Sequence, residues 1–596
     1  MAISQAPRGS SAVALGVDRL GIDDVVAVAR AGAAVTRLSG DALRGVEATA
    51  AWVARTVSQI STSDKPKAYY GINTGFGAQA GRSALGTRYL TQVLGRNLIA
   101  SHSVGVGPFF DEDVVRAAVL IRAQSLAQGR SGVRAVVVDT LVDMLNAGVY
   151  PAIPEQGSLG ASGDLAPLAH LALVLAKTPS ESEGDLDLHL DPTDGEAFMK
   201  CDGPGPAGTI LHLTEDYFTG EQTLWRKGRG EEAMAPVGGQ IDLQAKEALA
   251  LMNGSTFSAA IAALVVRDAQ NILDHAQLAV AMTLDGIRGF RDPFFAVLHQ
   301  ARGHAAAAVV GARVLDYLAG SELLDPGDLG TDPLRVPPQD RYSVRCAPQV
   351  LGSAADTLEL ARRWVEMDIN AATDNPLIFM ELERDYKAVS GGNFHGEPIA
   401  MAMDFLAIAL TDLGNMSDRR MFMLTDYHPQ KTYADPESKS GPMHGLPYFL
   451  IDEPTRTSGL NSGLMMLQAT AAALVSDCKA LAHPDSIDSI PSSANQEDHV
   501  SMSLNAARHA REIVRNIEIV LAMEILCAAQ AIDLQLAKHG NEALSPGRGV
   551  AAACATLREA GIAPLTRDRV LRADIRTALK LLRDGTLLQA AREAGR

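Results

Sequence analysis

The sequence predicts a mainly α-helical protein whose core is a bundle of long helices. Alanine and leucine are abundant, aromatic residues make up only 5% of the chain, and alternating strand patterns are scarce and short. Apolar residues instead recur over long stretches at the spacing of one helix face. These helical windows are residues 112–147, 245–282, 353–373, 398–424, 462–482 and 503–537.

Local signals predict where helices end and where the helical pattern is interrupted. The run Asp374-Asn375-Pro376 is a strong stop signal after the window 353–373, because proline lacks an amide proton and restricts the residue before it. Residues 178–220 and 428–445 are polar and rich in turn-forming residues. Each is therefore expected to be a surface excursion from the helical core.

Charge and composition narrow the class of protein. The 596 residues carry 53 Lys and Arg against 70 Asp and Glu, a formal net charge of -17, without a long basic cluster. We therefore expect no nucleic acid partner. The sequence has no run of about 18 uncharged apolar residues, which a membrane span would need, and we expect no signal peptide at its start. Five scattered cysteines without a CxxC pair favour a reducing compartment, so the chain is expected to be cytoplasmic.

The segment "GSLGASGDLAPLAH" (157–170) is the most unusual stretch of the chain. A phosphate-binding loop would need a Walker lysine or a strand–GxGxxG–helix unit, and a hydrolase elbow would need G-x-S-x-G. The segment has none of these. A tight structural turn before a helix that begins near Leu165 is one interpretation of its composition. A chemical interpretation is also open.

In Ala161-Ser162-Gly163 the chain can modify itself. The amide nitrogen of Gly163 can attack the carbonyl carbon of Ala161 and close a five-membered ring, because small side chains permit that close approach. Loss of one water from the ring and one from Ser162 leaves an exocyclic methylene, a strong electrophile that no ordinary side chain supplies. The flanking glycines permit the strained loop conformation that this cyclisation requires.

The same segment resembles the signature of the aromatic amino acid ammonia-lyase and aminomutase family, in which Ala-Ser-Gly becomes a methylidene-imidazolone (MIO) group. Seven further blocks resemble family blocks, stand in the family's order and span most of the chain from about residue 20 to 540, so chance agreement is negligible. These blocks are "YYGINTGFG" (69–77), "RNLIASHSVGVG" (96–107), "ALMNG" (250–254), "QDRYSVRCAPQVLG" (339–352), "DNPLIF" (374–379), "SGGNFHGEPIA" (390–400) and "SANQEDHVSM" (493–502).

The resemblance implies an architecture and a reaction. The chain would form one lyase domain over residues 1–596, in homotetramers whose active sites are shared between subunits. Its regions would be an N-terminal catalytic-loop region (about 1–110), a central helical core (about 111–540) and a C-terminal helical tail (about 541–596). The enzyme would remove ammonia across the α and β carbons of an amino acid. An MIO group made from residues 161–163 would take the substrate amine covalently, with no diffusible cofactor.

The resemblance also assigns roles around the reacting atoms. Tyr70, directly before "GINTGFG", matches the catalytic base, and adjacent Tyr69 fits the motif less well. A free phenol titrates near 10, so this base must act as phenolate or within a network that lowers its pKa. Asn253 matches the asparagine beside the MIO oxygen, where it is a candidate for stabilising developing charge. Tyr342 matches a tyrosine near the MIO, and Arg345 matches the arginine that pairs with the substrate carboxylate.

Other residues are expected to line the site. Phe394 matches an aromatic residue packed against the MIO, and Gln339 and Gln496 resemble polar lining residues. His395 and His499 are interpreted as structural neighbours of the site rather than as catalytic groups. The fourteen histidines show no H-E-x-x-H or comparable spacing, so we expect no metal site.

Substrate choice depends on fewer residues. The pair Ser101-His102 resembles histidine ammonia-lyases, although some tyrosine aminomutases share it. Glu497, in "NQEDHV", favours histidine more strongly, because phenylalanine and tyrosine enzymes usually have Asn-Gln-Asp-Val there. Physically, Glu497 can accept a hydrogen bond from an imidazole N–H, which a phenyl ring lacks. A related lyase that acts on ergothioneine tends to have lysine where this chain has Met465.

Three hypotheses follow from these observations. The first is a histidine ammonia-lyase that yields trans-urocanate and ammonia. The second is another aromatic amino acid lyase or a 2,3-aminomutase, in which ammonia re-adds to the β carbon. The third is a catalytically silent helical scaffold, which the intact Ala161-Ser162-Gly163, Tyr70, Arg345 and Asn253 disfavour.

Overall fold

The chain forms two compact units. The first comprises Met1–Arg267, Arg362–Asp404 and Pro484–Arg508, and the second comprises Asp268–Ala361, Phe405–His483 and His509–Arg596. The computed structural model describes residues 12–17, 19–82, 84–176, 195–199, 210–213, 224–225, 236–237, 240–324, 339–425, 446–452, 459–539 and 544–595.

The predicted mainly α-helical class is confirmed. The described residues contain eighteen α-helices, whereas their strands are only two to five residues long. Four helices contribute residues to both units: α8 (Thr256–Ile287), α12 (Ala347–Asp368), α13 (Glu397–Thr425) and α15 (Ser503–His539). Among the described residues, α13 alone is long and apolar enough to cross a membrane by length and composition, and 61% of its most apolar window is buried inside the protein.

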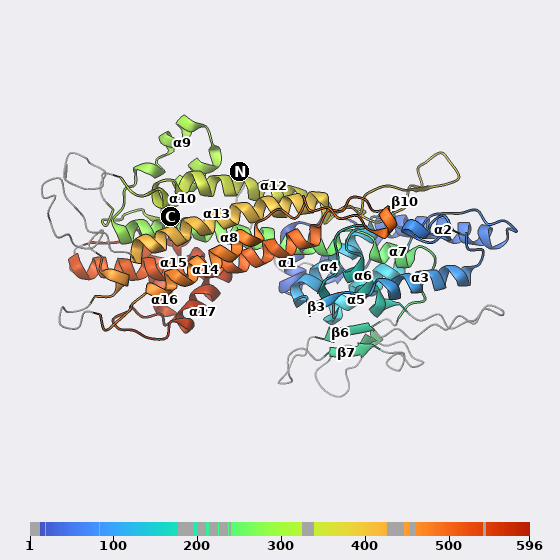
Figure 1. The fold of residues 1–596 in the computed structure, drawn as a ribbon, viewed down its shortest axis with the longest axis horizontal. Coiled ribbons are helices and arrows are strands. Elements are labelled where there is room, and N and C mark those ends of the chain that lie inside the picture. The colour runs from blue at the N-terminus through green and yellow to red at the C-terminus, as the bar shows by residue number, and fades with distance from the viewer. Residues whose placement is uncertain are drawn as a thin grey trace. The chain divides into compact units, whose positions relative to one another are not determined.

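The first unit is built around α4 (Glu112–Ala127), in which every residue from Val114 onwards is buried. Helix α4 packs against α1 (Ile22–Arg30), α2 (Gly40–Ser61) and α5 (Ala135–Ala147). Helix α3 (Arg88–His102) packs against α6 (Leu165–Leu175) and α7 (Glu247–Met252). Figure 1 shows these helices in blue to green. Their packing brings chain segments from residue 88 to residue 252 together.

Short strand pairs accompany these helices. A three-stranded antiparallel sheet has the order β4 (Val149–Pro151), β6 (Gly195–Met199) and β7 (Ile210–Leu213). The other pairs are β1 (Val13–Ala14) with β2 (Val35–Thr36), β3 (Val106–Phe109) with β5 (Pro154–Gln156), β8 (Leu224–Trp225) with β9 (Pro236–Val237), and β10 (Leu377–Ile378) with β11 (Ala388–Val389).

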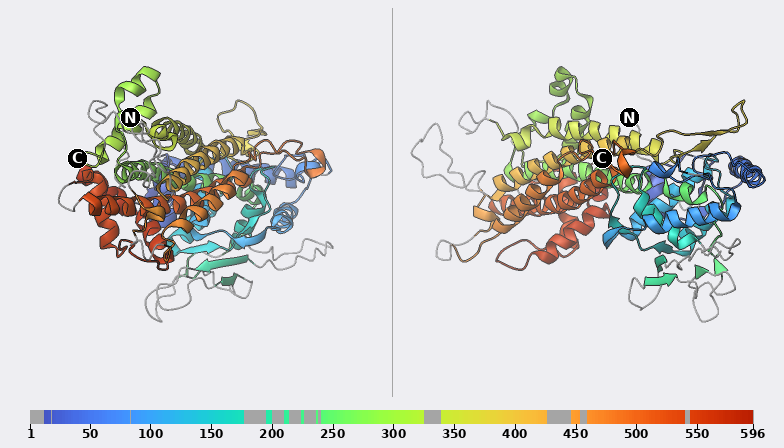
Figure 2. Two further views of the ribbon diagram at one scale, coloured as in Figure 1. Left: turned by 60° about the vertical axis from the view of Figure 1, so that its left-hand side comes forward. Right: turned by 45° about the vertical axis from the view of Figure 1, so that its right-hand side comes forward.

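The second unit is a helical bundle joined by a buried polar centre. The carboxylate of Glu524 on α15 accepts hydrogen bonds from Thr283 of α8 and from Ser417 and Arg420 of α13. Figures 1 and 2 show α13, α14 (Met465–Leu481) and α15 side by side. The remaining helices of the unit are α9 (Ala296–Arg302), α10 (Ala305–Tyr317), α11 (Tyr342–Arg345), α16 (Arg548–Glu559), α17 (Arg572–Arg583) and α18 (Thr586–Gly595).

A buried carboxylate in this unit holds the start of the C-terminal helices. Asp285 of α8 accepts a hydrogen bond from Ser321 Oγ at 2.6 Å and from the Gly547 amide, directly before α16, at 2.8 Å. Burial raises the pKa of Asp285 to about 7, although both hydrogen bonds lower it. The charged form of this carboxyl group is therefore disfavoured in the folded protein.

Three of the predicted windows differ from the helices in the structure. The window 112–147 is two helices, because Gly129 and Gly132 between them adopt positive φ angles of 67° and 73°. The window 245–282 breaks between α7 and α8 at Asn253 and Gly254. Helix α12 ends at Asp368, before the predicted stop at Asp374, because the Asn370 side chain exchanges two hydrogen bonds with the backbone of Leu20.

The other windows correspond to single helices with ends within three residues of the expectation, namely α13, α14 and α15. The expected excursion 428–445 lies outside the described residues, and of the excursion 178–220 only β6 and β7 are described.

Candidate active site

The glycine-rich loop is anchored by Asp164, which is fully buried at the start of α6. Its carboxylate accepts hydrogen bonds from the Ser258 amide (2.8 Å), from Ser258 Oγ (2.9 Å) and from Ser158 Oγ (3.1 Å). Burial raises the pKa of Asp164 to about 6, and these hydrogen bonds oppose that rise. The loop is therefore fixed at its C-terminal side to α8, which carries Ser258.

Gly163 makes a backbone contact that only glycine permits. Its φ is +79°, and a Cβ atom there would lie 2.1 Å from the carbonyl carbon of Gly254. The neighbouring backbone pairs with the same residue, because the Asp164 amide donates to Gly254 O at 2.8 Å and the Gly254 amide donates to Ser162 O at 3.2 Å. The break between α7 and α8 thus serves to hold the loop.

Ser162 is contacted at both its polar ends. Its hydroxyl donates to Glu497 Oε1 at 2.9 Å, and its carbonyl oxygen accepts from Asn253 Nδ2 at 2.6 Å. With the Gly254 amide, that oxygen has two donors, which is the arrangement of an oxyanion hole. Charge that develops on the Ser162 oxygen would be stabilised without rearrangement.

Glu497 is presented by a strained turn. Ser493, Ala494 and Asn495 all have φ between 52° and 67°, a left-handed conformation that costs energy for residues with a side chain. The second carboxylate oxygen of Glu497 accepts from Ser492 Oγ at 2.9 Å. Both oxygens of the carboxylate are therefore held, one by the turn itself and one by the loop.

Tyr70 lies beside this turn. The backbone of Gly77 hydrogen-bonds Tyr70, and a Cβ atom on Gly77 would be 2.8 Å from Ser493 Oγ. Burial raises the pKa of Tyr70 and so does the nearby charge of Glu497, whereas the Gly77 hydrogen bond lowers it. Electrostatics therefore link Tyr70 to Glu497, and a hydrogen bond links Glu497 to Ser162.

Ser101 and His102 are the last two residues of helix α3. This helix packs against α6, which follows the loop, and against α7, which precedes Asn253. His102 Nδ1 lies 2.8 Å from the carbonyl oxygen of Leu98, which can only accept, so Nδ1 carries the proton. Ser101 Oγ lies 3.0 Å from the same nitrogen. His102 Nε2 is then an acceptor in the neutral ring.

Four further residues of the first unit are placed less directly. Phe394 is half-buried and stands two residues before Gly396. A Cβ atom on Gly396 would lie 2.3 Å from Ser503 Oγ. Ser503 in turn hydrogen-bonds Ser258, which anchors the loop. Gln496 is exposed. His395 and His499 pack edge to face, with ring centroids 5.6 Å apart.

Gln339, Tyr342 and Arg345 belong to the second unit. The guanidinium of Arg345 lies over the Tyr342 ring at 4.4 Å, and the ring is 69% exposed. Arg345 Nε is buried without a hydrogen-bond partner, and Gln339 is exposed. The structure thus groups Tyr342 with Arg345, and it groups Tyr70, the loop, Asn253 and Glu497 in the first unit.

Sequence reasoning assigned no role to Asp164, Ser258 or Arg122, although all three contact the loop or its partners. Arg122 is fully buried on α4, and its Nη1 donates to the carbonyl oxygen of Asn253 at 2.7 Å. One signal was present in the sequence: Arg122 is a charged residue in the middle of an apolar helical run.

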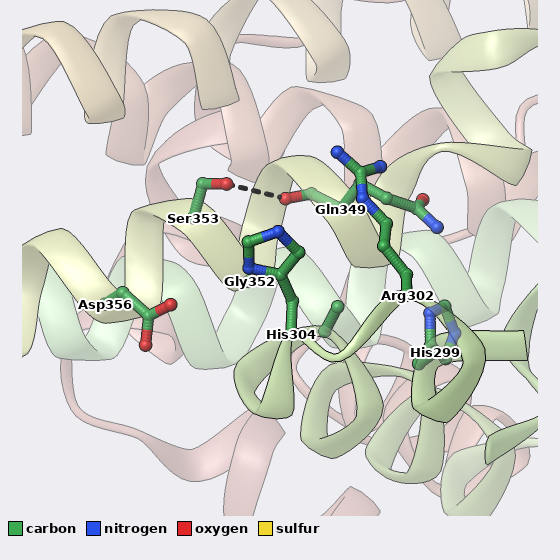
Figure 3. A pocket seen from close by; sticks show the side chains of 8 residues that line it. His299, Arg302, His304, Gln349, Gly352, Ser353 and Asp356 are labelled. Carbon is green, nitrogen blue, oxygen red and sulfur yellow. Dashed lines mark hydrogen bonds between the residues drawn. The ribbon is translucent and has the colours of Figure 1, made fainter. Parts of the chain in front are cut away.

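A small cavity in the second unit does not suit an amino acid. Its volume is about 30 Å³, room for a few waters at most. Figure 3 shows its lining, with the Ser353 hydroxyl donating to the Gln349 carbonyl at 3.0 Å. None of the predicted site residues lines it, and no cluster of three or more His, Cys, Asp or Glu suited to a metal ion occurs among the described residues.

Comparisons with known proteins agree on one family. The family model described as aromatic amino acid lyase matches residues 20–559. A histidine ammonia-lyase of Caldanaerobacter subterraneus is 41% identical over 530 residues, 89% of each chain. The structure of a tyrosine aminomutase from Streptomyces globisporus has a TM-score of 0.80 at 31% identity, covering 98% of this chain and 99% of that one. Histidine ammonia-lyase from Trypanosoma cruzi has a TM-score of 0.77 at 31% identity, covering 98% and 96%. The chain belongs to the aromatic amino acid lyase family.

Proposed function

We propose that the protein is a histidine ammonia-lyase, a carbon–nitrogen lyase that converts L-histidine to trans-urocanate and ammonia without oxidation. The observation that carries this proposal is the network at Ser162, whose hydroxyl contacts Glu497 and whose carbonyl oxygen contacts Asn253. Relatives named histidine ammonia-lyase that are 40–43% identical over most of the chain support the same activity.

We infer that residues 161–163 form an MIO group. Gly163 N would bond to the Ala161 carbonyl carbon with loss of that oxygen as water, and Ser162 would lose its hydroxyl and α proton as a second water. Three features of the uncyclised loop fit this reaction: a glycine where a Cβ would collide, a hydroxyl hydrogen-bonded to a carboxylate, and a carbonyl oxygen with two donors. The MIO supplies an electrophile that makes the substrate amine a better leaving group.

Tyr70 is the proposed base for the β proton. Its pKa is raised by burial and by Glu497, so the phenolate is scarce at neutral pH. Turnover should therefore increase with pH in the range where Tyr70 ionises. Arg345, Tyr342 and Gln339 would bind or border the amino-acid end of the substrate, and Phe394 and Gln496 would line the site.

Glu497 and His102 are the proposed contacts to the imidazole ring. Before cyclisation, Glu497 Oε1 accepts the Ser162 hydroxyl. That hydroxyl leaves as water in the proposed ring closure, which frees the same carboxylate oxygen for an imidazole N–H. His102 Nε2 and the adjacent Ser101 would meet the other side of a polar ring.

A homotetramer with shared active sites is the proposed assembly. Three large apolar side chains on α13 are 37–49% exposed, namely Phe405, Ile408 and Phe422, and Met466 on α14 is 61% exposed. A second subunit would remove this surface from water.

A cytoplasmic location is also proposed. It is supported by the free thiols of four cysteines, Cys346, Cys478, Cys527 and Cys554.

Product analysis tests the function. The purified protein is incubated separately with L-histidine, L-phenylalanine and L-tyrosine, and each product is identified by mass and chirality. We expect urocanate and ammonia from histidine. A β-amino acid would instead favour the alternative of an aminomutase, to which the similarity to tyrosine aminomutase gives some support. Absence of turnover on all three substrates would contradict the proposal.

A further inference from the structure

A buried hydrogen-bond chain leads from Arg122 to the carbonyl oxygen of Ser162. Arg122 Nη1 donates to the main-chain oxygen of Asn253 at 2.7 Å. The N–H of the same peptide group, which belongs to Gly254, donates to Ser162 O at 3.2 Å. One peptide bond therefore connects the guanidinium to the oxygen that would become the ring carbonyl of the MIO.

The guanidinium is held in place. Its Nη2 donates to Ser125 Oγ at 2.9 Å, and Nη1 also lies 3.4 Å from Thr256 Oγ1. A Cβ atom at position 254 would lie 2.9 Å from Nη1, so only glycine leaves room for this contact. The side chain is fully buried, where a charge is screened little by water.

Arg122, Lys246 and Asp374 together carry a net positive charge. Lys246 and Asp374 form an ion pair in which both side chains are fully buried. Asp374 attracts Arg122, and Arg122 repels Lys246, so the three groups interact. Two cations thus share one buried carboxylate, and one of them, Arg122, contacts the Asn253–Gly254 peptide. Burial lowers the pKa of Arg122 to about 10, which leaves it charged at neutral pH.

We propose that Arg122 is a positioning residue that acts through the Asn253–Gly254 peptide. Its charge polarises that peptide, so that the Gly254 N–H donates more strongly to Ser162 O as negative charge develops there. Donors in a chain of hydrogen bonds strengthen one another, and a charged donor strengthens the chain most. Donors aimed at such an oxygen typically contribute about 10²–10³-fold to rate. This inference rests on the proposed MIO group.

A matched control lies on the same helix. Arg116 of α4 is also buried and also donates to main-chain carbonyls, those of Val28 and Leu145. Those carbonyls are not part of the loop or of its contacts. Loss of Arg116 should therefore cost stability as loss of Arg122 does, without changing the electrophile.

The test compares Arg122→Gln, Arg122→Lys and Arg116→Gln in the full-length protein. Three properties are measured without substrate: the intact mass, the absorbance band of the MIO, and the second-order rate constant for addition of cyanide to it. Arg122→Gln, which keeps a donor and loses the charge, should retain the two-water mass deficit, shift the band to shorter wavelength and slow addition at least about 10-fold. Arg122→Lys should stay within about 3-fold of the parent, and Arg116→Gln should be unchanged in both band and rate.

Parental band and rate in folded Arg122→Gln would overturn the inference. Equal losses in Arg122→Gln and Arg122→Lys would also overturn it, because the charge would then not be the cause. If Arg122→Gln does not fold, Arg122→Met replaces it, because it keeps most of the side-chain length without a donor or a charge, and a parental band and rate in that variant would overturn the inference. A parent without the two-water deficit would instead contradict the proposed MIO itself.

Discussion

Exchange of Glu497 for glutamine is expected to separate recognition of the imidazole ring from the chemistry at the amino group. The variant keeps the size of the side chain and loses its charge. Before cyclisation, Glu497 Oε1 accepts a hydrogen bond from the Ser162 hydroxyl at 2.9 Å. In the proposed complex, the same oxygen accepts a hydrogen bond from the N–H of the substrate ring. A hydrogen bond to a charged group contributes about 1.5–3 kcal/mol, so kcat/KM for histidine should fall roughly ten- to over a hundredfold.

The same substitution should also shift the pH dependence of turnover. The negative charge of Glu497 raises the pKa of Tyr70. Its removal should lower that pKa, so the alkaline rise of kcat/KM should move to lower pH in Glu497→Gln. The two effects are distinguishable, because the first is specific to histidine and the second applies to every substrate.

The assay compares how much kcat/KM changes between parent and variant for each of two substrates. kcat/KM is measured for histidine and phenylalanine in parent and variant across pH, after intact mass has shown that both have lost two waters. Phenylalanine has no ring N–H and should lose little. A variant that loses equally on both substrates, or a parent that prefers phenylalanine, would refute the assignment of Glu497 to the imidazole ring.

Four other outcomes are expected. Ser162→Ala should keep its encoded mass and lose most turnover while remaining folded; full activity would contradict the MIO assignment. Gly163→Ala, whose Cβ would lie 2.1 Å from the carbonyl carbon of Gly254, should also fail to lose water, as intact mass will show. Tyr70→Phe should lower kcat at least about 10²-fold with substrate binding retained, and a near-parental kcat would move the base elsewhere. The folded-state pKa of Asp285, about 7, exceeds its ordinary value of 3.8, so its stabilising contribution is complete below pH 3.8 and is lost as pH rises through 7. The free energy of unfolding in urea should therefore differ less between pH 5.5 and pH 8.5 in Asp285→Asn than in the parent, by on the order of 1–4 kcal/mol. An equal difference in both proteins would contradict the assigned titration.

Helices were predictable where local signals are sufficient. The apolar periodicity located α13 and α15 nearly to the residue, because their limits coincide with changes in that periodicity. The end of α12 was not predictable, since it depends on a contact between Asn370 and Leu20, 350 positions apart. The break at Gly129 and Gly132 had a local signal, because two glycines in four residues favour a turn.

The resemblance supplied the residues of the candidate site, but not the contacts between them. Tyr70, Ser162, Asn253 and Glu497 stand in separate blocks of the sequence, and nothing in their spacing predicts that they meet. Arg122 could only be suspected, as a charge in an apolar run, because its partner is a main-chain carbonyl that any residue would offer. A hydrogen bond to a main-chain carbonyl does not restrict which residue supplies that carbonyl.

The contacts of Ser162 impose an order of events on biosynthesis. The residues that hold its carbonyl oxygen and its hydroxyl lie 91 and 335 positions later in the chain. When a ribosome has completed the loop, neither Asn253 nor Glu497 exists, so a nascent chain lacks the two side-chain contacts that would assist the proposed ring closure. The electrophile would therefore appear only in molecules whose distant segments have already come together, and a misfolded chain would carry unreactive alanine, serine and glycine. The two-water mass deficit would then measure, molecule by molecule, how much of a preparation has folded.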